Sequence, residues 1–230
     1  MNIFTSYFDS LAYVWPLNQS KNASNLIYPE RNTTILHTEV CQTNDISSTA
    51  IPYLIVIVCS AIHNSKARYS IRQSWAKDTN TLKSVKVVFL VGQHLNKTHQ
   101  KMLEKEHEEY GDIIQESFID TYANLTIKSL MLLKWFTKNC GGTQYVMKTD
   151  DDMYINLVRL YEIVQTNQNP NLLLGSLICN AIPIKDPYNK WFVPSYMFSE
   201  KIYPNYLSGN LSLVICNLKS NFVTNQAHIF

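Results

Sequence analysis

The stretch YLIVIVCSAI, residues 53–62, decides the fold that the sequence predicts. It is almost wholly apolar, rich in β-branched residues and followed by the polar run HNSKAR. The run is too short for a membrane-spanning helix, and its length and composition are typical of a strand that is buried on both faces of a sheet. We therefore expect a central strand here, with Cys59 as a small buried apolar side chain.

Helix-like and strand-like segments alternate after this strand. We expect helices over 66–76, 99–111, 124–142 and 156–167, and strands over 85–92, 112–118 and 144–150. Gly111 suits the end of the second helix, because glycine readily takes the left-handed conformation of a helix C-cap. The alternation predicts an α/β fold with a mostly parallel sheet flanked by helices on both faces.

The composition sets the outer limits. The chain has 230 residues, of which 46% are hydrophobic, enough for one sizeable core. Residues 1–48 are rich in Asn, Ser and Thr and have no apolar period, so we expect a stem-like extension there and one domain over 49–230. The net charge of +2 gives no reason to expect a nucleic-acid partner or direct adhesion to a membrane surface.

Two further patterns are typical of the secretory pathway. Asn-X-Ser/Thr triplets make candidate N-glycosylation sites of Asn18, Asn22, Asn32, Asn96, Asn124 and Asn210, unless an Asn-rich chain produces them by chance. The cysteines lack the CxxC or His/Cys spacing of a zinc site. The cysteines other than Cys59 are able to form disulfides in an oxidising compartment, and they are Cys41, Cys140, Cys179 and Cys216. Because the chain has five cysteines, at least one stays unpaired, and the sequence does not show which residues pair.

Three adjacent carboxylates, Asp150, Asp151 and Asp152, follow the strand 144–150. In open α/β sheets the ligand site lies beyond the carboxyl ends of the strands. Side chains at i and i+2 of an extended segment project to the same side, so we expect Asp150 and Asp152 to face one cavity and Asp151 to point elsewhere. Hard divalent cations such as Mg²⁺ and Mn²⁺ prefer such oxygens. The alternative is an acidic turn that caps the next helix, a role that Asn156 can also take.

Several longer motifs, in order, resemble the β-1,3-galactosyltransferase family, which includes related β-1,3-N-acetylglucosaminyltransferases. They are RYSIRQSWA, VVFLVG, EYGDIIQESFIDTYANLTIKSLMLLKWFTKNC, YVMKTDDDMYIN and KWFVPSYMFSEKIYPNYLSGN. The resemblance implies a GT-A nucleotide-sugar transferase fold and an Mn²⁺-dependent, inverting transfer of galactose or N-acetylglucosamine from UDP to a glycan acceptor. It also implies the luminal side of the Golgi membrane, with a type II anchor that we do not find in this chain.

The resemblance implies roles for individual residues. Asp152 would be the direct Mn²⁺ ligand, with Asp150 beside it and nearer the ribose or sugar. Donor-binding residues would be Arg68, Arg72, Lys148, Asp150 and Asp151, and sugar contacts would come from Lys128, Trp191 and Tyr206. Each has a plainer alternative: solvation on a helix face for the arginines, a charge partner to the aspartates for Lys148, and core packing for the aromatic residues. Trp75 is expected in the core.

The chain departs from the family pattern near its end. Leu207 stands where the family has Cys, and Asn210 and Leu211 follow Gly209 where it has further glycines. The acidic pair that supplies the family's general base does not follow, and neither Asp186 nor Glu200 matches it. We therefore expect the C-terminal part of the fold to lie outside this chain. Three functions stay open: a β-1,3-hexosyltransferase, an inactive donor-binding or partner-binding relative, and a structural domain whose aspartates are caps.

Overall fold

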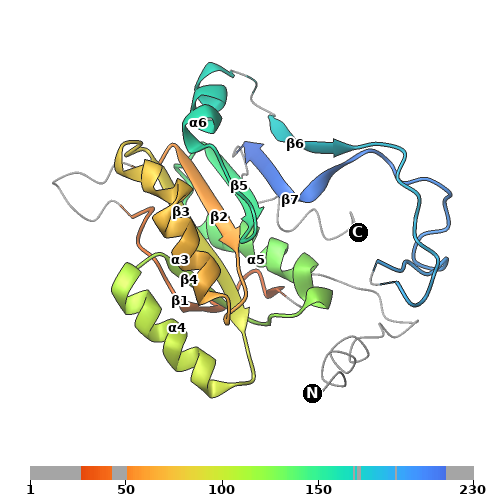
Figure 1. Ribbon diagram of the computed structural model, residues 1–230, viewed down its shortest axis with the longest axis horizontal. Helices are drawn as coiled ribbons and strands as arrows, with labels where there is room; N and C mark the ends of the chain where they lie inside the picture. The colour runs from red at the N-terminus through yellow and green to blue at the C-terminus, as the bar shows by residue number, and fades with distance from the viewer. Residues whose placement is uncertain (1–26, 43–50, 168, 170–171, 190, 216–230) are drawn as a thin grey trace.

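A seven-stranded sheet forms the centre of the computed structural model, which describes residues 27–42, 51–167, 169, 172–189 and 191–215 (Figure 1). The strand order is β1-β4-β3-β2-β5-β7-β6. The strands are β1 (Thr34–Leu36), β2 (Leu54–Cys59), β3 (Val85–Gln93), β4 (Ile113–Ile119), β5 (Tyr145–Asp150), β6 (Leu173–Ile178) and β7 (Tyr206–Ile215). Strands β4, β3, β2 and β5 are parallel neighbours. At the two ends of this group, β1 pairs antiparallel with β4, and β7 pairs antiparallel with β5. The fold is thus the predicted α/β architecture with a mostly parallel sheet.

Strand β2 lies at the middle of the sheet and is buried along its whole length. Leu54, Val56 and Val58 pack into one apolar cluster, and Ile55 and Ile57 pack into another on the opposite face. Cys59 belongs to the second cluster, where burial raises the pKa of its thiol to about 11. The prediction of a doubly buried strand is confirmed.

Helices cover both faces. They are α3 (Ser65–Gln73), α4 (Lys97–Tyr110), α5 (Leu125–Asn139) and α6 (Leu157–Thr166). Side chains of α3, α4 and α6 join the first cluster and those of α5 join the second, so α5 lies on the other side of the sheet (Figure 1).

Local signals explain where these helices begin and end. The Asn96 side chain accepts from the Thr98 amide at the start of α4, and Gly111 ends that helix with φ at 65°. Asn156 caps α6 in the same way, through the Arg159 amide. The predicted helix 66–76 stops at Gln73 and continues as a 3₁₀ helix, Trp75–Asn80. Trp75 is only 3% exposed, and its indole donates to the Met153 carbonyl, as expected of a core residue.

The buried face of α5 differs in part from the expected apolar face. Trp135 and Phe136 are buried as predicted, but Leu125 at the start of the helix is 45% exposed. Two lysines, Lys128 and Lys134, are buried instead. Their ammonium groups have fixed oxygen partners, which compensates for the loss of water.

Part of the expected stem is integral to the domain, which corrects the expected boundary at residue 48. Strand β1 pairs with β4, and Ile27 is buried beside Met131. The Lys134 ammonium donates to the Ile27 carbonyl and to Thr33 Oγ1, and burial lowers its pKa. A strand of three residues is too short to show a period, so its polar anchoring is visible only in three dimensions.

The sheet is completed by two strands that the sequence analysis did not predict, β6 and β7. Strand β7 runs antiparallel to β5, with Thr149 opposite Leu211, so Tyr206 and Gly209 extend past the carboxyl end of β5. The long connection between β6 and β7 projects to one side of the molecule (Figure 1). Among the helices of the described ranges, none combines the length and apolar character that a bilayer crossing requires.

A disulfide joins Cys41 to Cys140 across a sequence separation of 99 residues, and it ties the N-terminal segment to the end of α5. We predict that a Cys41→Ser/Cys140→Ser double variant loses about 2–5 kcal/mol of unfolding free energy, because the unfolded chain regains a long loop. Urea denaturation followed by tryptophan fluorescence measures this loss. Cys179→Ser is the matched control, since Cys179 is exposed and unpaired within the described residues, and its midpoint should not move. Equal midpoints for all three proteins would contradict the prediction.

Candidate functional site

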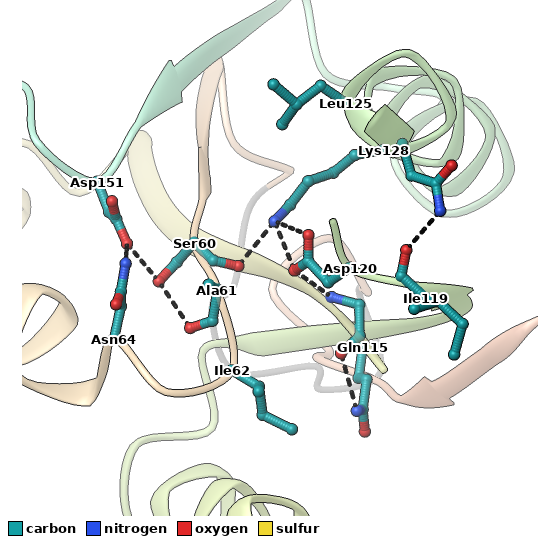
Figure 2. A network of polar contacts seen from close by, with 12 residues as sticks. Ser60, Ala61, Ile62, Asn64, Gln115, Ile119, Asp120, Leu125, Lys128 and Asp151 are labelled. Carbon is teal, nitrogen blue, oxygen red and sulfur yellow. Dashed lines mark hydrogen bonds and ion pairs between the residues drawn. The ribbon is translucent and has the colours of Figure 1, made fainter. Parts of the chain in front are cut away.

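The polar side chains of the site gather at the carboxyl edge of the parallel strands. Ser60 directly follows β2, Asp120 directly follows β4, and Asp150 to Asp152 end β5 and continue beyond it. Because β2 is hydrogen-bonded to β5, with Cys59 opposite Asp150, the residues that follow these two strands are neighbours. Figure 2 shows the network that results.

Asp151 is turned back toward β2. Its Oδ2 accepts from Ser60 Oγ at 2.7 Å and from Asn64 Nδ2 at 2.9 Å (Figure 2). Asn64 lies at the N-cap position of α3, but its side chain makes no capping hydrogen bond. The middle carboxylate of the three is therefore bound to the β2–α3 connection.

Asp150 and Asp152 have different surroundings. Asp150 is half-buried, and burial raises the pKa of its carboxyl; the Lys148 ammonium at 3.4 Å opposes this rise, and the Asp152 charge adds to it. Asp152 is exposed and makes no hydrogen bond or ion pair with the part of the chain that is described. Lys148 also donates to the Gly209 carbonyl, so it links the end of β5 to β7.

Arg68 is placed differently from the expected donor-binding role. It is 0% exposed, and all five of its N–H groups are used. They donate to both carboxylate oxygens of Glu106, to Ser60 Oγ, and to the Ala61 and Ile62 carbonyls. With no N–H left over, the Arg68 guanidinium is fully committed to partners within the protein.

Arg72 is also committed to the protein. Two of its nitrogens donate to the Asp112 carboxylate and a third to Glu106. Its guanidinium lies 4.7 Å from the Phe89 ring centroid and 4.0 Å from that of Tyr110. Burial alone would raise the pKa of Glu106, but the hydrogen bonds and charges of Arg68 and Arg72 outweigh it and hold that pKa below its ordinary value.

Lys128, expected as a sugar contact, is buried in the network instead (Figure 2). Its ammonium donates to the Ser60 carbonyl at 2.8 Å and to both oxygens of Asp120, the nearer at 2.7 Å. Asp120 also accepts from the amide of Gly92, where an added Cβ would lie 2.8 Å from the Asp120 Cβ. The sequence analysis missed Asp120, although its position two residues after the predicted strand 112–118 is a usable signal.

The two aromatic candidates lie in and after the β6–β7 connection. Trp191 is 55% exposed, and Tyr206 begins β7 at the edge where β5 ends. The Tyr206 ring lies 6.1 Å from that of Tyr203. Tyr206 is 43% exposed, so the exposed fractions of both side chains argue against plain core packing.

The candidate glycosylation sites differ in accessibility. Asn32 and Asn96 are exposed, whereas Asn124 is only 8% exposed and its amide donates to the Ile119 carbonyl. Asn18 and Asn22 lie outside the described residues, as does Cys216, and the Asn210 side chain is likewise not described.

No three His, Cys, Asp or Glu side chains among the described residues are grouped so as to hold a metal ion by themselves. Mg²⁺ and similar hard cations are commonly held by one or two carboxylates together with substrate phosphates and water. Asp150 and Asp152 fit that pattern, since both are carboxylates and Asp152 is exposed and unpartnered in the described chain.

The Lys128–Asp120 pair yields a test of the network. We predict that Lys128→Met lowers the unfolding free energy by about 3–5 kcal/mol, because it leaves a buried carboxylate without its cation. Urea denaturation provides the measurement. Lys138→Met, an exposed lysine on the same helix, is the control and should change little. Adding Asp120→Asn to Lys128→Met should recover part of the loss, and a single variant as stable as the control would refute the structural role.

Comparison with known proteins adds independent information. A family model described as galactosyltransferase matches residues 66–229. Beta-1,3-galactosyltransferase 5 of Pan troglodytes is 36% identical over 160 residues, covering 69% of this chain and 54% of the relative, and that of Homo sapiens is equally similar with 52% covered. Beta-1,3-galactosyltransferase 1 of Mus musculus is 34% identical over 163 residues, covering 69% and 50%.

The chain thus spans about half the length of the curated relatives it matches, and the matched region includes α3, the aspartates after β5 and strand β7. The chain belongs to the galactosyltransferase family.

Proposed function

We propose that this chain carries the donor-binding region of a UDP-sugar-dependent β-1,3-hexosyltransferase. The enzyme would transfer galactose or N-acetylglucosamine to a hydroxyl of a glycan acceptor with inversion at the sugar carbon. It would act with Mn²⁺ on the luminal side of the Golgi membrane. Galactose is the donor sugar that the names of the relatives favour.

One observation carries the proposal: two carboxylates stand at the carboxyl edge of a parallel sheet without strong partners of their own. The Asp152 side chain makes no hydrogen bond or ion pair with the described chain, and the Asp150 carboxylate is paired there only with Lys148, at 3.4 Å. At this edge open α/β sheets bind their ligands. The Asp152 carboxylate is therefore available to a ligand, and it is not needed to cap α6, because Asn156 already does so.

The proposal gives each residue of the site a separate role. Asp152 and Asp150 would hold Mn²⁺, which would neutralise charge on the diphosphate and stabilise the UDP leaving group. Lys148 limits the repulsion between the two carboxylates and stays close to the Gly209 carbonyl of β7. Trp191 and Tyr206 offer exposed rings, a suitable surface for the C–H faces of sugars.

The proposal assigns no general base. Inverting transfer uses a group that removes the proton of the acceptor hydroxyl, typically worth about 10²- to 10⁴-fold in rate. Asp186 accepts a hydrogen bond from the Tyr188 amide in a turn, and Glu200 is exposed, so neither is distinguished as a base. Donor binding and sugar transfer therefore need separate measurements.

We predict that UDP binds this chain only when Mn²⁺ is present, and that Asp152→Asn weakens this binding by ~100-fold or more, since even the outer partners of metal ligands are worth about 10- to 100-fold. Isothermal titration with UDP, with Mn²⁺ and with EDTA, measures both effects.

Glu200→Gln is the matched control, because it removes one exposed carboxylate elsewhere and should leave the affinity unchanged. Release of UDP from UDP-galactose or UDP-N-acetylglucosamine, with mixed glycan acceptors, then reports transfer and the preferred sugar. An affinity for UDP that changes neither with EDTA nor with Asp152→Asn would overturn the proposal.

A further inference from the structure

Asp151 forms both of its hydrogen bonds through a single oxygen. Ser60 Oγ and Asn64 Nδ2 both lie within 2.9 Å of Asp151 Oδ2, and Oδ1 accepts no side-chain hydrogen bond within the described chain. One sp² oxygen has two lone pairs, so it can satisfy both donors. This arrangement needs an acceptor at one position and makes no direct use of the second oxygen.

The Ser60 hydroxyl is set up to donate to that oxygen. Arg68 donates to Ser60 Oγ at 3.0 Å, which occupies a lone pair and leaves the hydroxyl hydrogen to be donated. Two acceptors are within reach: Asp151 Oδ2 at 2.7 Å and the Ala61 carbonyl at 3.4 Å. The shorter contact to a charged acceptor is the stronger one, so the hydrogen points to Asp151.

Ser60 itself is held from several elements. Arg68 of α3 binds its hydroxyl and is fixed in turn by both oxygens of Glu106 on α4. Lys128 of α5 binds its carbonyl and pairs with Asp120 after β4 (Figure 2). The Ser60 hydroxyl that donates to Asp151 is therefore held in place by two buried side chains, Arg68 and Lys128.

Asn64 gives a second, independent indication. Its place before α3 is the N-cap, where an Asn side chain normally accepts from an amide of the first turn. Here it makes no capping bond and donates to Asp151 instead. A favourable local interaction is thus given up for a contact with the segment after β5.

We propose that Asp151 is a positioning residue that orients Asp150 and Asp152 without itself binding the donor or the metal. Asp151 and Asp152 lie in a turn after β5, not in an extended segment as expected, and the Met153 amide donates to the Asp150 carbonyl at 3.4 Å. Because the Asp151 side chain is bonded to the β2–α3 connection, it fixes this turn and with it the backbone positions of Asp150 and Asp152. Asp151 acts through its hydrogen-bond acceptor, not through its charge. The proposal rests on the proposed function, since it assigns a role within the same donor site.

Asn and Ala variants separate the two roles. Asp151→Asn keeps a carbonyl oxygen for Ser60 and Asn64 but removes the charge, whereas Asp151→Ala removes the acceptor. We expect Asp151→Ala to weaken Mn²⁺-dependent UDP binding by about 10- to 100-fold, as loss of an outer partner of a metal ligand does. Asp151→Asn should rescue most of that loss, while Asp152→Asn should not retain binding.

The experiment is isothermal titration of UDP with Mn²⁺ into the whole chain and its variants, with thermal unfolding and circular dichroism on the same samples. Ser60→Ala removes the donor and keeps the carbonyl that Lys128 binds, so it should reproduce part of the Asp151→Ala loss. The Ser60→Ala/Asp151→Ala double variant should then bind UDP no more weakly than Asp151→Ala alone, because both substitutions remove the same hydrogen bond. Ser60→Ala also serves as the test if Asp151→Ala does not fold.

The possible outcomes are distinct. An Asp151→Asn variant as defective as Asp152→Asn would show that the Asp151 charge binds the donor or metal, which overturns the positioning role but leaves the proposed function standing. Unchanged UDP binding by both Asp151→Ala and Ser60→Ala would show that the donor site does not depend on the Ser60–Asp151 hydrogen bond, which would overturn the positioning role. Failure of the folded wild-type chain to bind UDP with Mn²⁺ would overturn the proposed function, and the positioning role with it.

Discussion

The burial of the Arg68 guanidinium is the constraint around which this end of the sheet is built. A buried cation is tolerated only when a counter-charge and hydrogen-bond acceptors replace its water. Glu106 supplies the charge, and the β2–α3 connection supplies one hydroxyl and two carbonyls. Each acceptor must then keep a fixed place, so one guanidinium determines the path of the chain just beyond the central strand.

The same requirement extends through the rest of the polar edge. Ser60 receives Arg68 on its hydroxyl and Lys128 on its carbonyl, and Lys128 needs Asp120 as its own counter-charge. Asp120 in turn accepts from the Gly92 amide at the end of β3. The ends of β2, β3 and β4 are therefore fixed relative to one another by groups that are too buried to be left unpaired. On the outer side of the sheet, Lys134 and the Cys41–Cys140 disulfide fix the N-terminal segment in a comparable way.

The sequence predicts the parts of this protein that depend on local pattern. The continuous apolar run of β2, the end of α4 at Gly111 and the capping ability of Asn156 are all readable from neighbouring residues. Parts that depend on distant partners are not readable in this way. Arg68 and Glu106 are 38 residues apart, so an arginine on an amphipathic helix gives no sign that it is buried and paired. Strand β1 is equally hidden, because its three residues are stabilised by pairing with β4 and by hydrogen bonds to Glu116.

The candidate site follows the same division. Position after a strand suffices to place the three aspartates at the ligand edge of the sheet. It does not show that Asp151 and Asp152 lie in a turn, or what Asp151 contacts. The three adjacent carboxylates would repel one another strongly if they shared one environment. They do not: Asp151 accepts two hydrogen bonds from the β2–α3 connection, Asp150 lies beside the Lys148 ammonium, and Asp152 is exposed to solvent. A chain can place three carboxylates side by side when each has a different environment. The exposed carboxylate, Asp152, is the one to which we propose the role of metal ligand.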